Sequence, residues 1–228
     1  MPEPRALNRV PVWKNERAVL YCACESLPSL TSSSKCFLIK LYHEAIAVAR
    51  QTEDKRPISS ALNNLAELYR MDEEYEKAIP LYEEALRIDR EREDSTGVVL
   101  GPVNLSRNAL MQGGLDPVRS QLAEAARIAD EAHLIDYGLG TIETSAILRF
   151  ALGGHLQGAR LFGSAEMELR KKGYQRTQPD EKFTAYWIAI MRETLGEAAF
   201  STAMTEGGKL SYAEAMVETR KWLQERQE

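Results

Sequence analysis

Residues 59 to 92 read SSALNNLAELYRMDEEYEKAIPLYEEALRIDRER, and this stretch decides the fold. Its first half carries apolar residues spaced by three, four and seven positions, which is the pattern of one helix face. Its second half repeats the pattern with Ala78, Tyr82 and Ala85. The segment MDEEY between the halves is long enough only for a short turn. The stretch therefore predicts two antiparallel helices.

A register of 40 residues extends this pattern along the chain. Large apolar residues fall on the register, and an alanine follows each of them three positions later. Repetition at a period in this range indicates stacked supersecondary units rather than a single closed core. The register consists of Tyr42, Tyr82, Leu122 and Phe162, followed by Ala45, Ala85, Ala125 and Ala165.

The 34 residues that begin at Ser59 carry a family pattern. Apolar or small residues occupy positions 4, 7, 8, 11, 20, 24 and 27. This pattern resembles the tetratricopeptide repeat, a helix–turn–helix unit of 34 residues. The resemblance implies an all-α solenoid of helix hairpins with a concave binding face. The six extra residues per repeat, such as REDSTG, lengthen either the second helix or the loop between repeats.

The chain divides into three parts. We expect residues 1 to 30 to form an irregular segment or a poor capping helix, because terminal repeats are often atypical. Residues 31 to 175 are predicted to hold the repeats, of which the first shows only its second helix clearly. Residues 176 to 228 are predicted to form a C-terminal helical cap that covers the last repeat. Its expected core is Trp187, Met191, Phe200 and Trp222.

The tail carries a second set of motifs. Residues 159 to 166 read ARLFGSAE, Pro179 precedes an aromatic helix, LGEAAF occupies residues 195 to 200, and residues 206 to 215 fit EG-x-x-LS-x-x-EA. Asp180 is predicted to cap the helix that follows Pro179. The tail resembles the C-terminal repeat region of bacterial LuxR-type and cyclase-linked signalling ATPases that regulate transcription. The resemblance implies the regulatory or sensor part of such a system, whose nucleotide hydrolysis belongs to a separate domain.

Motifs for catalysis are missing from the sequence. There is no G-x-x-x-x-G-K-[ST], G-x-S-x-G, H-E-x-x-H or C-x-x-C string. Ser32 to Lys35 fit S-x-x-K without its companion motifs, so a solvated linker is the simpler interpretation. Cys22, Cys24 and Cys36 with His43 lack the usual spacing of a zinc site. We expect no catalytic residues, no cofactor and no metal, and an unrecognised hydrolase is the least favoured alternative.

Composition limits the partners and the compartment. The net charge is −5 and the sequence pI is about 5.5, which disfavours direct contact with nucleic acid. No run of about 18 apolar residues predicts a membrane span, and the N-terminus lacks an export signal. The three cysteines do not form a disulfide framework. We therefore expect a cytoplasmic protein with a protein or peptide partner and no membrane partner.

The concave face supplies the candidate binding site, because the first helix of each pair lines it. Asn64 and Asn104 lie one repeat apart, and an amide can both donate to and accept from a peptide backbone. Arg70 and Arg107 could pair with a carboxylate. Ordinary solvated polar faces remain the alternative interpretation. The candidate peptide-binding residues are Asn63, Asn64, Glu67, Arg70, Asn104, Arg107, Glu143 and Thr144.

Self-assembly is the alternative function. The first clear helix lacks a good partner helix on its N-terminal side, so its apolar stripe is expected to be uncovered. Exposed stripes of this kind mark interfaces, and two copies could meet there as a two-fold homodimer. The candidate self-association residues are Phe37, Leu38, Leu41 and Tyr42.

Overall fold

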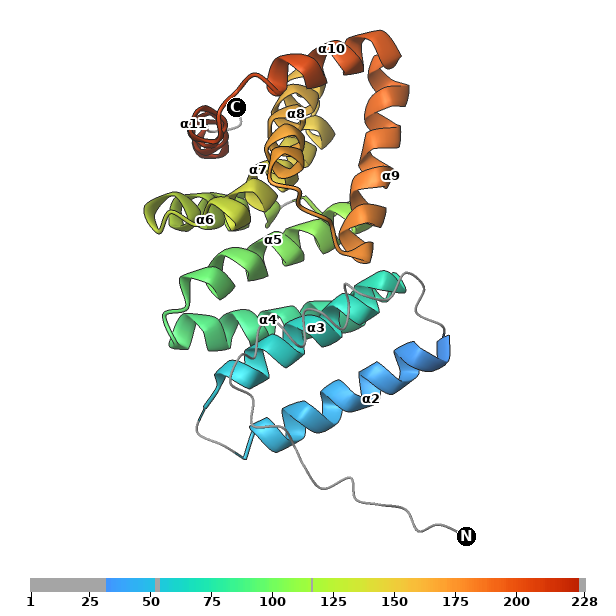
Figure 1. Ribbon diagram of the computed structural model, residues 1–228, viewed down its shortest axis with the longest axis vertical. Helices are drawn as coiled ribbons and strands as arrows, with labels where there is room; N and C mark the ends of the chain where they lie inside the picture. Colours follow the sequence, from blue (N-terminus) through green and yellow to red (C-terminus); the bar gives the residue numbers. More distant parts are fainter. Residues whose placement is uncertain (1–31, 52–53, 116, 226–228) are drawn as a thin grey trace.

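The computed structural model describes residues 32–51, 54–115 and 117–225, and this part of the chain contains ten helices and no strand (Figure 1). The predicted all-α solenoid is confirmed, while the prediction for residues 1 to 30 lies outside the described residues. The repeat helices are α2 (Ser32–Ala49), α3 (Arg56–Met71), α4 (Tyr75–Glu91), α5 (Ser95–Gln112), α6 (Val118–Glu131), α7 (Ile135–Ala151) and α8 (His155–Lys171). The tail helices are α9 (Gln178–Leu195), α10 (Glu197–Gly207) and α11 (Tyr212–Gln224).

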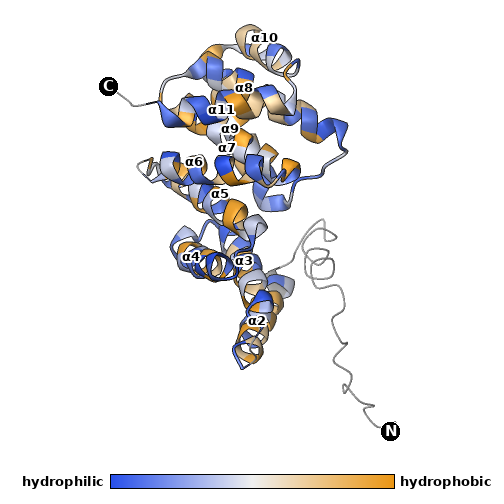
Figure 2. Cartoon of the chain, turned by 90° about the vertical axis from the view of Figure 1, so that its left-hand side faces the viewer, coloured by the Kyte–Doolittle hydropathy of each residue, from blue (hydrophilic) through white to orange (hydrophobic). Residues whose placement is uncertain are grey.

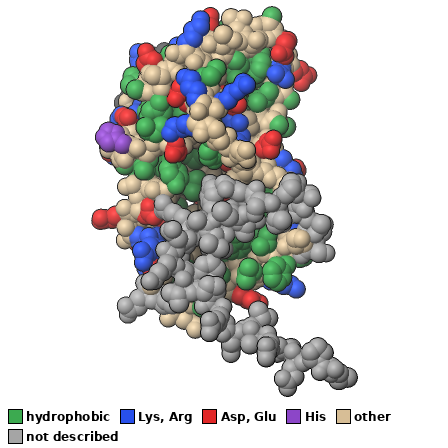
Figure 3. Space-filling model, viewed as in Figure 1, with side chains coloured by type: hydrophobic (Ala, Val, Ile, Leu, Met, Phe, Trp, Pro, Cys, Tyr) green, Lys and Arg blue, Asp and Glu red, His purple; other side chains and the backbone are tan. Residues whose placement is uncertain are grey.

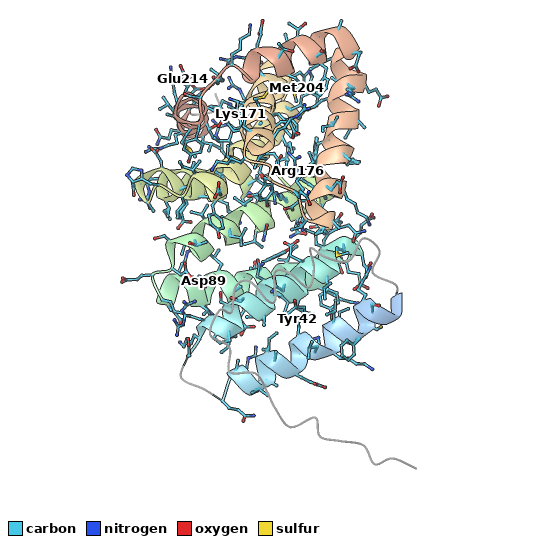
Figure 4. The ribbon with its side chains drawn as sticks, viewed as in Figure 1. Tyr42, Asp89, Lys171, Arg176, Met204 and Glu214 are labelled. Carbon is cyan, nitrogen blue, oxygen red and sulfur yellow. The ribbon has the colours of Figure 1, made fainter. Side chains whose placement is uncertain are left out.

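Consecutive helices pack as hairpins that stack along the long axis of the molecule (Figure 1). The pairs α3–α4, α5–α6 and α7–α8 form the hairpins, and α2 packs against α3. The 40-residue register lies on α2 and on the second helix of each pair, where its large side chains are at most 1% exposed. Tyr42 lies between α2 and α3 (Figure 4), and the other three fill equivalent places in later hairpins.

The turns follow a shorter period than the repeats. A residue with positive φ occurs every 20 positions in successive turns, whether the turn lies within a hairpin or between hairpins. The extra residues per repeat therefore extend the helices, and the connection between repeats is as short as the turn inside each hairpin. Each helix and its turn together form one 20-residue unit. The positive-φ positions of these turns are Glu73, Glu93, Gly113, His133, Gly153 and Gly173, and Gly196 between α9 and α10 also has positive φ but lies outside the period.

The tail helices attach to several repeats at once. α10 packs against α8, α11 packs against α6, α7 and α8, and α9 contacts α3, α8 and α10. Of the expected core of the tail, Trp187, Met191 and Phe200 are buried and Trp222 is partly buried. The tail therefore reaches beyond the last repeat, as far as the helix that opens the first complete hairpin.

Two glycines allow α8 and α10 to approach closely. A Cβ on Gly207 would lie 1.7 Å from the carbonyl oxygen of Arg160, and a Cβ on Gly163 would lie 2.5 Å from the carbonyl oxygen of Met204. Both distances are far below van der Waals contact, so only glycine fits at these places. The close contact of α8 with α10 therefore explains both Gly163 in the ARLFGSAE motif and Gly207 after Glu206.

Apolar residues line the contacts between helices, and polar residues cover most of the outer faces (Figure 2). Side chains of both charge signs are interspersed on the face shown in Figure 3. Among the described helices, none is long and apolar enough to cross a membrane.

Candidate functional site

Seven charged side chains meet where α3, α5 and α7 face the start of α9. Each ion pair shares a residue with the next, so the seven form one continuous series of alternating charge. We call this series the charge network. In order, it comprises Glu67, Arg70, Asp180, Arg107, Glu143, Arg176 and Glu166.

Asp180 stands at the centre of the charge network. Its Oδ1 accepts hydrogen bonds from Nη2 of Arg70 at 2.5 Å and from Nη1 of Arg107 at 2.8 Å. The side chain of Asp180 is only 13% exposed. Burial alone would raise the pKa of Asp180, but the positive charges of Arg107 and Arg70 lower this pKa to about 2. The carboxylate is therefore held charged by two arginines from successive repeats.

The arginine on α3 has a second carboxylate partner on its own helix. Glu67 accepts a hydrogen bond from Nη2 of Arg70 at 2.6 Å, and its other oxygen accepts from the hydroxyl of Tyr82 at 2.5 Å. Burial lowers the pKa of Arg70, but Glu67 and Asp180 outweigh that effect and raise the pKa well above its usual value. Burial and the neighbouring Glu67 also raise the pKa of Tyr82.

Arg107, on α5, is likewise held by side chains of the next repeat. Arg107 donates to Glu143 and to Thr144 on α7, each at 3.2 Å. Its guanidinium also lies 5.7 Å from the ring centroid of Phe183 on α9, within range of a cation–π interaction. Both Arg107 and Glu143 are buried. These two side chains therefore do not belong to a solvated polar face.

The segment that joins α8 to α9 closes the far end of the charge network. Arg176 (Figure 4) donates to Glu143 and to Glu166, the latter at 2.5 Å. Burial would lower the pKa of Arg176, but Glu143 and Glu166 raise it above its usual value. The network thus ties α3, α5, α7 and α8 to the segment that begins α9.

The structure brings together most of the predicted groove residues. Glu67, Arg70, Arg107, Glu143 and Thr144 all lie in or beside the charge network. Two of the predicted amides meet directly across the repeats. Nδ2 of the buried Asn104 donates to Oδ1 of Asn63 at 3.1 Å. Asn64 lies half-buried on α3.

α9 contacts α3, α8 and α10, and its buried residues form one stripe along the helix. The chain positions of the buried residues recur every three or four residues, which is the period of one helix face. At its start, the carbonyl oxygen of Pro179 accepts from Nη1 of Arg70 at 3.5 Å, and Lys182 donates to the carbonyl oxygen of Met71 at 3.1 Å. The buried residues are Pro179, Phe183, Thr184, Trp187 and Met191.

The sequence analysis missed the α9 part of the site. Asp180 was expected to cap its helix, but the helix begins two residues earlier, at Gln178, and the carboxylate binds α3 and α5 instead. Arg176 and Glu166 were not singled out. The one available signal was Asp180 itself, an acidic residue directly after a proline in a helix that carries an apolar stripe.

The structure buries part of the predicted self-association stripe on α2 and leaves the rest exposed. Tyr42 is only 1% exposed and packs against α3, so the expectation that it lies uncovered is wrong. Leu38 is partly buried in the same cluster. Phe37 and Leu41 are 65% and 43% exposed, and Val48 on the same face is 63% exposed.

No group of three or more metal-ligating side chains is present within the described residues. Cys36 is an exposed free thiol, whereas Cys22 and Cys24 lie outside the described residues. The chemistry that the site does offer is the recognition of carboxylates by arginine, in a partly dehydrated setting where such pairs are strong.

Residues 38–91 match the family described as tetratricopeptide repeat. The match spans α2, α3 and α4, and it includes both Glu67 and Arg70. No curated protein and no solved structure matches the chain. Tetratricopeptide repeats generally act as protein–protein interaction modules.

Proposed function

We propose that this protein binds a peptide or a neighbouring domain of a partner protein on its concave face, between α3, α5 and α7. The observation that carries the proposal is the pairing of Arg70 and Arg107 with the one carboxylate of Asp180. Two arginines from successive repeats thus hold an acidic group on this face, which in the free chain is the carboxylate of Asp180. The proposed contact residues are Asn63, Asn64, Glu67, Arg70, Asn104, Arg107, Glu143 and Thr144.

The cost of the charge network supports a binding role. Burying ion pairs costs desolvation energy that their mutual attraction offsets only in good geometry, and apolar side chains of similar volume are often as stabilising. Stability alone therefore does not explain seven charged groups in this place. Departures from the simplest packing commonly occur where a protein performs its function.

The tail suggests the setting in which this binding takes place. We propose that the chain is the regulatory or sensor part of a bacterial signalling or transcription-regulator system, acting in the cytoplasm. The support is the resemblance of ARLFGSAE, LGEAAF and the EG-x-x-LS-x-x-EA block to such regulators. The net charge of −5 favours a protein partner over nucleic acid or an anionic membrane.

A photo-crosslinking amino acid at Asn64 tests the concave face in the native host, because Asn64 is half-buried on α3, three residues before Glu67. We expect a discrete protein adduct that is at least tenfold weaker in the variant Arg70→Met/Arg107→Met. The same crosslinker at Val217, which is exposed on α11, serves as the matched control. Equal adducts at both positions, or an adduct unchanged by the arginine variant, would show that the partner binds elsewhere.

A second candidate function is self-assembly through α2, as a homodimer. Phe37, Leu41 and Val48 are exposed on one face of this helix, and exposed apolar stripes commonly mark interfaces. Light scattering on the full chain should then show a dimer that Phe37→Glu/Leu41→Glu converts to a monomer. A wild-type chain that stays monomeric at high concentration would exclude this candidate.

A further inference from the structure

We infer that the first half of α9 is a built-in competitor for the concave site, and that a partner binds by displacing it. The inference rests on the function proposed above. It adds a regulatory step and assigns the partner a chemical form, which is an amphipathic helix with a carboxylate in its first turn. The observation that supports it is that the start of α9 contacts Arg70 on α3 and Arg107 on α5.

The contacts made by α9 resemble those of a separate ligand. Pro179, Asp180 and Lys182 all reach side chains or carbonyl groups on α3, which lie more than 100 residues away in the sequence. Asp180 also bridges to α5. In the helix-in-groove mode of recognition, an amphipathic helix lays an apolar stripe against its receptor. α9 carries such a stripe and adds the polar contacts at its start.

The concave site stays electrically balanced when α9 leaves. Without Asp180, Arg70 keeps Glu67, Arg107 keeps Glu143, and Arg176 bridges Glu143 and Glu166. Three arginines then face three glutamates. Removing one partner of a buried ion pair is strongly destabilising only when the other charge is left uncompensated, and that condition does not arise here. Release of Asp180 is therefore compatible with a folded solenoid.

The two halves of α9 are held differently. Trp187 and Met191 of the second half belong to the main core beside α10, and Phe183 of the first half belongs to the same core, but the polar contacts of α9 with α3 and α5 all come from the first half. α10 and α11 are fixed independently of the charge network, since Gly163 and Gly207 allow the contact of α10 with α8 and Glu218 pairs with Arg149 and Arg160. The first half depends on Asp180 and Phe183. On the inferred mechanism, a partner that takes over the contacts of Asp180 and Phe183 releases this first half while α10 and α11 stay in place.

The geometry also describes the displacing partner. Arg107 contacts both the carboxylate of Asp180 and the ring of Phe183, which lies three residues later on the same helix face. A partner helix that presents Asp or Glu in its first turn and an aromatic residue three positions on reproduces both contacts. A helix without that acidic residue lacks the group that the two arginines hold.

The experiment uses the full chain and a fluorescent peptide of residues 177–190 as the probe. In the variant Asp180→Asn/Phe183→Ser, the native first half of α9 is weakened as a competitor. Fluorescence anisotropy should show at least tenfold tighter peptide binding to this variant than to the wild-type chain. The same peptide with the change Asp180→Asn should bind the variant chain at least tenfold more weakly than the unchanged peptide does. Glu218→Gln is the matched control, because Glu218 also bridges two arginines but belongs to α11.

Hydrogen exchange provides the second readout and checks the fold. In Asp180→Asn/Phe183→Ser, amides of residues 178–186 should exchange at least tenfold faster, while those of α10 and α11 stay protected. Unchanged exchange in residues 178–186 would overturn the inference, and so would absence of peptide binding to the variant. Equal peptide binding to the wild-type and variant chains would also overturn it. Equal binding would still allow partner binding on the concave face, which the crosslinker at Asn64 tests separately.

Discussion

Arg70 and Arg107 donate hydrogen bonds to the same carboxylate oxygen, Oδ1 of Asp180, from the first helices of two successive repeats. Glu67 and Glu143 each hold one of these arginines, and Asp180 is the carboxylate that the two arginines share. Asp180 therefore links α3 to α5 through one carboxylate oxygen. Any group that replaces it must carry a comparable negative charge.

Replacing Arg107 with methionine should destabilise the chain strongly. The change leaves Glu143 with one cation fewer and Asp180 held by Arg70 alone, and breaking a buried ion pair typically costs about 3 to 5 kcal/mol. Urea unfolding followed by circular dichroism measures the loss. The control is Lys172→Met, which removes a solvent-exposed pair with Asp136 and should cost about 0 to 1 kcal/mol. Equal losses for both variants would contradict the central place of Arg107.

Acid should weaken the hold on α9 in a defined window. The pKa of Asp180 is lowered from 3.8 to about 2, so its contribution is present above pH 4 and is lost as the pH falls to 2. A shift of this size corresponds to about 2 kcal/mol. The facing groups Glu67 and Glu143 lie beside the same arginines, and Asp180→Asn isolates the part due to Asp180.

The pH prediction is measured as stability against urea between pH 5 and pH 2. The wild-type chain should lose more stability than Asp180→Asn over this range, by about 2 kcal/mol. If both chains lost the same stability between pH 5 and pH 2, folding would not lower the pKa of Asp180.

The contact of α8 and α10 predicts a difference between two adjacent glycines. A Cβ on Gly207 would lie 1.7 Å from the carbonyl oxygen of Arg160, so Gly207→Ala forces the two helices apart and should cost about 1 to 3 kcal/mol or more. Gly208→Ala is the matched control. Its nearest neighbour is the flexible side-chain end of Met167 at 3.2 Å, and it should be nearly neutral. Thermal unfolding compares the two, and similar melting temperatures would refute the close approach.

A fourth measurement tests the 20-residue turns. His133 has φ 53°, a left-handed conformation that costs a side-chain-bearing residue about 1 kcal/mol or more and costs glycine nothing. His133→Gly should therefore stabilise the chain by up to about 1 kcal/mol, less the backbone entropy that glycine loses on folding. Ala132→Gly, at φ −89°, should bring no gain. Differential scanning calorimetry on both variants decides the point, and a destabilised His133→Gly would count against it.

The fold was predictable because its information is local and repeated. Residues such as Tyr82 and Phe162 show their role through spacing within one helix and recurrence in the next repeat, and both signals lie in the sequence. The lengths of the turns were less apparent. Glu93 and His133 take the left-handed conformation without being glycine, so the sequence carries no composition signal at those turns.

The candidate site was only half predictable, for a different reason. Arg70 and Arg107 follow from their place on the inner helices, since that place is set by the same repeat pattern. Asp180 meets Arg70 from 110 residues away, and such a contact depends on how the solenoid curves and where the tail returns. Helix periodicity specifies neither of these. The same limit explains why the tail was expected to cover only the last repeat.

The 20-residue spacing of the turns restricts how a chain of this kind can change length in evolution. Adding one helix and its turn would reverse the direction of every later helix and exchange inner faces for outer ones. Adding two such units would insert a complete hairpin and leave all later faces in place. Viable relatives of different length should therefore differ in steps of 40 residues, and each step would lengthen the concave face while separating the tail helix from α3.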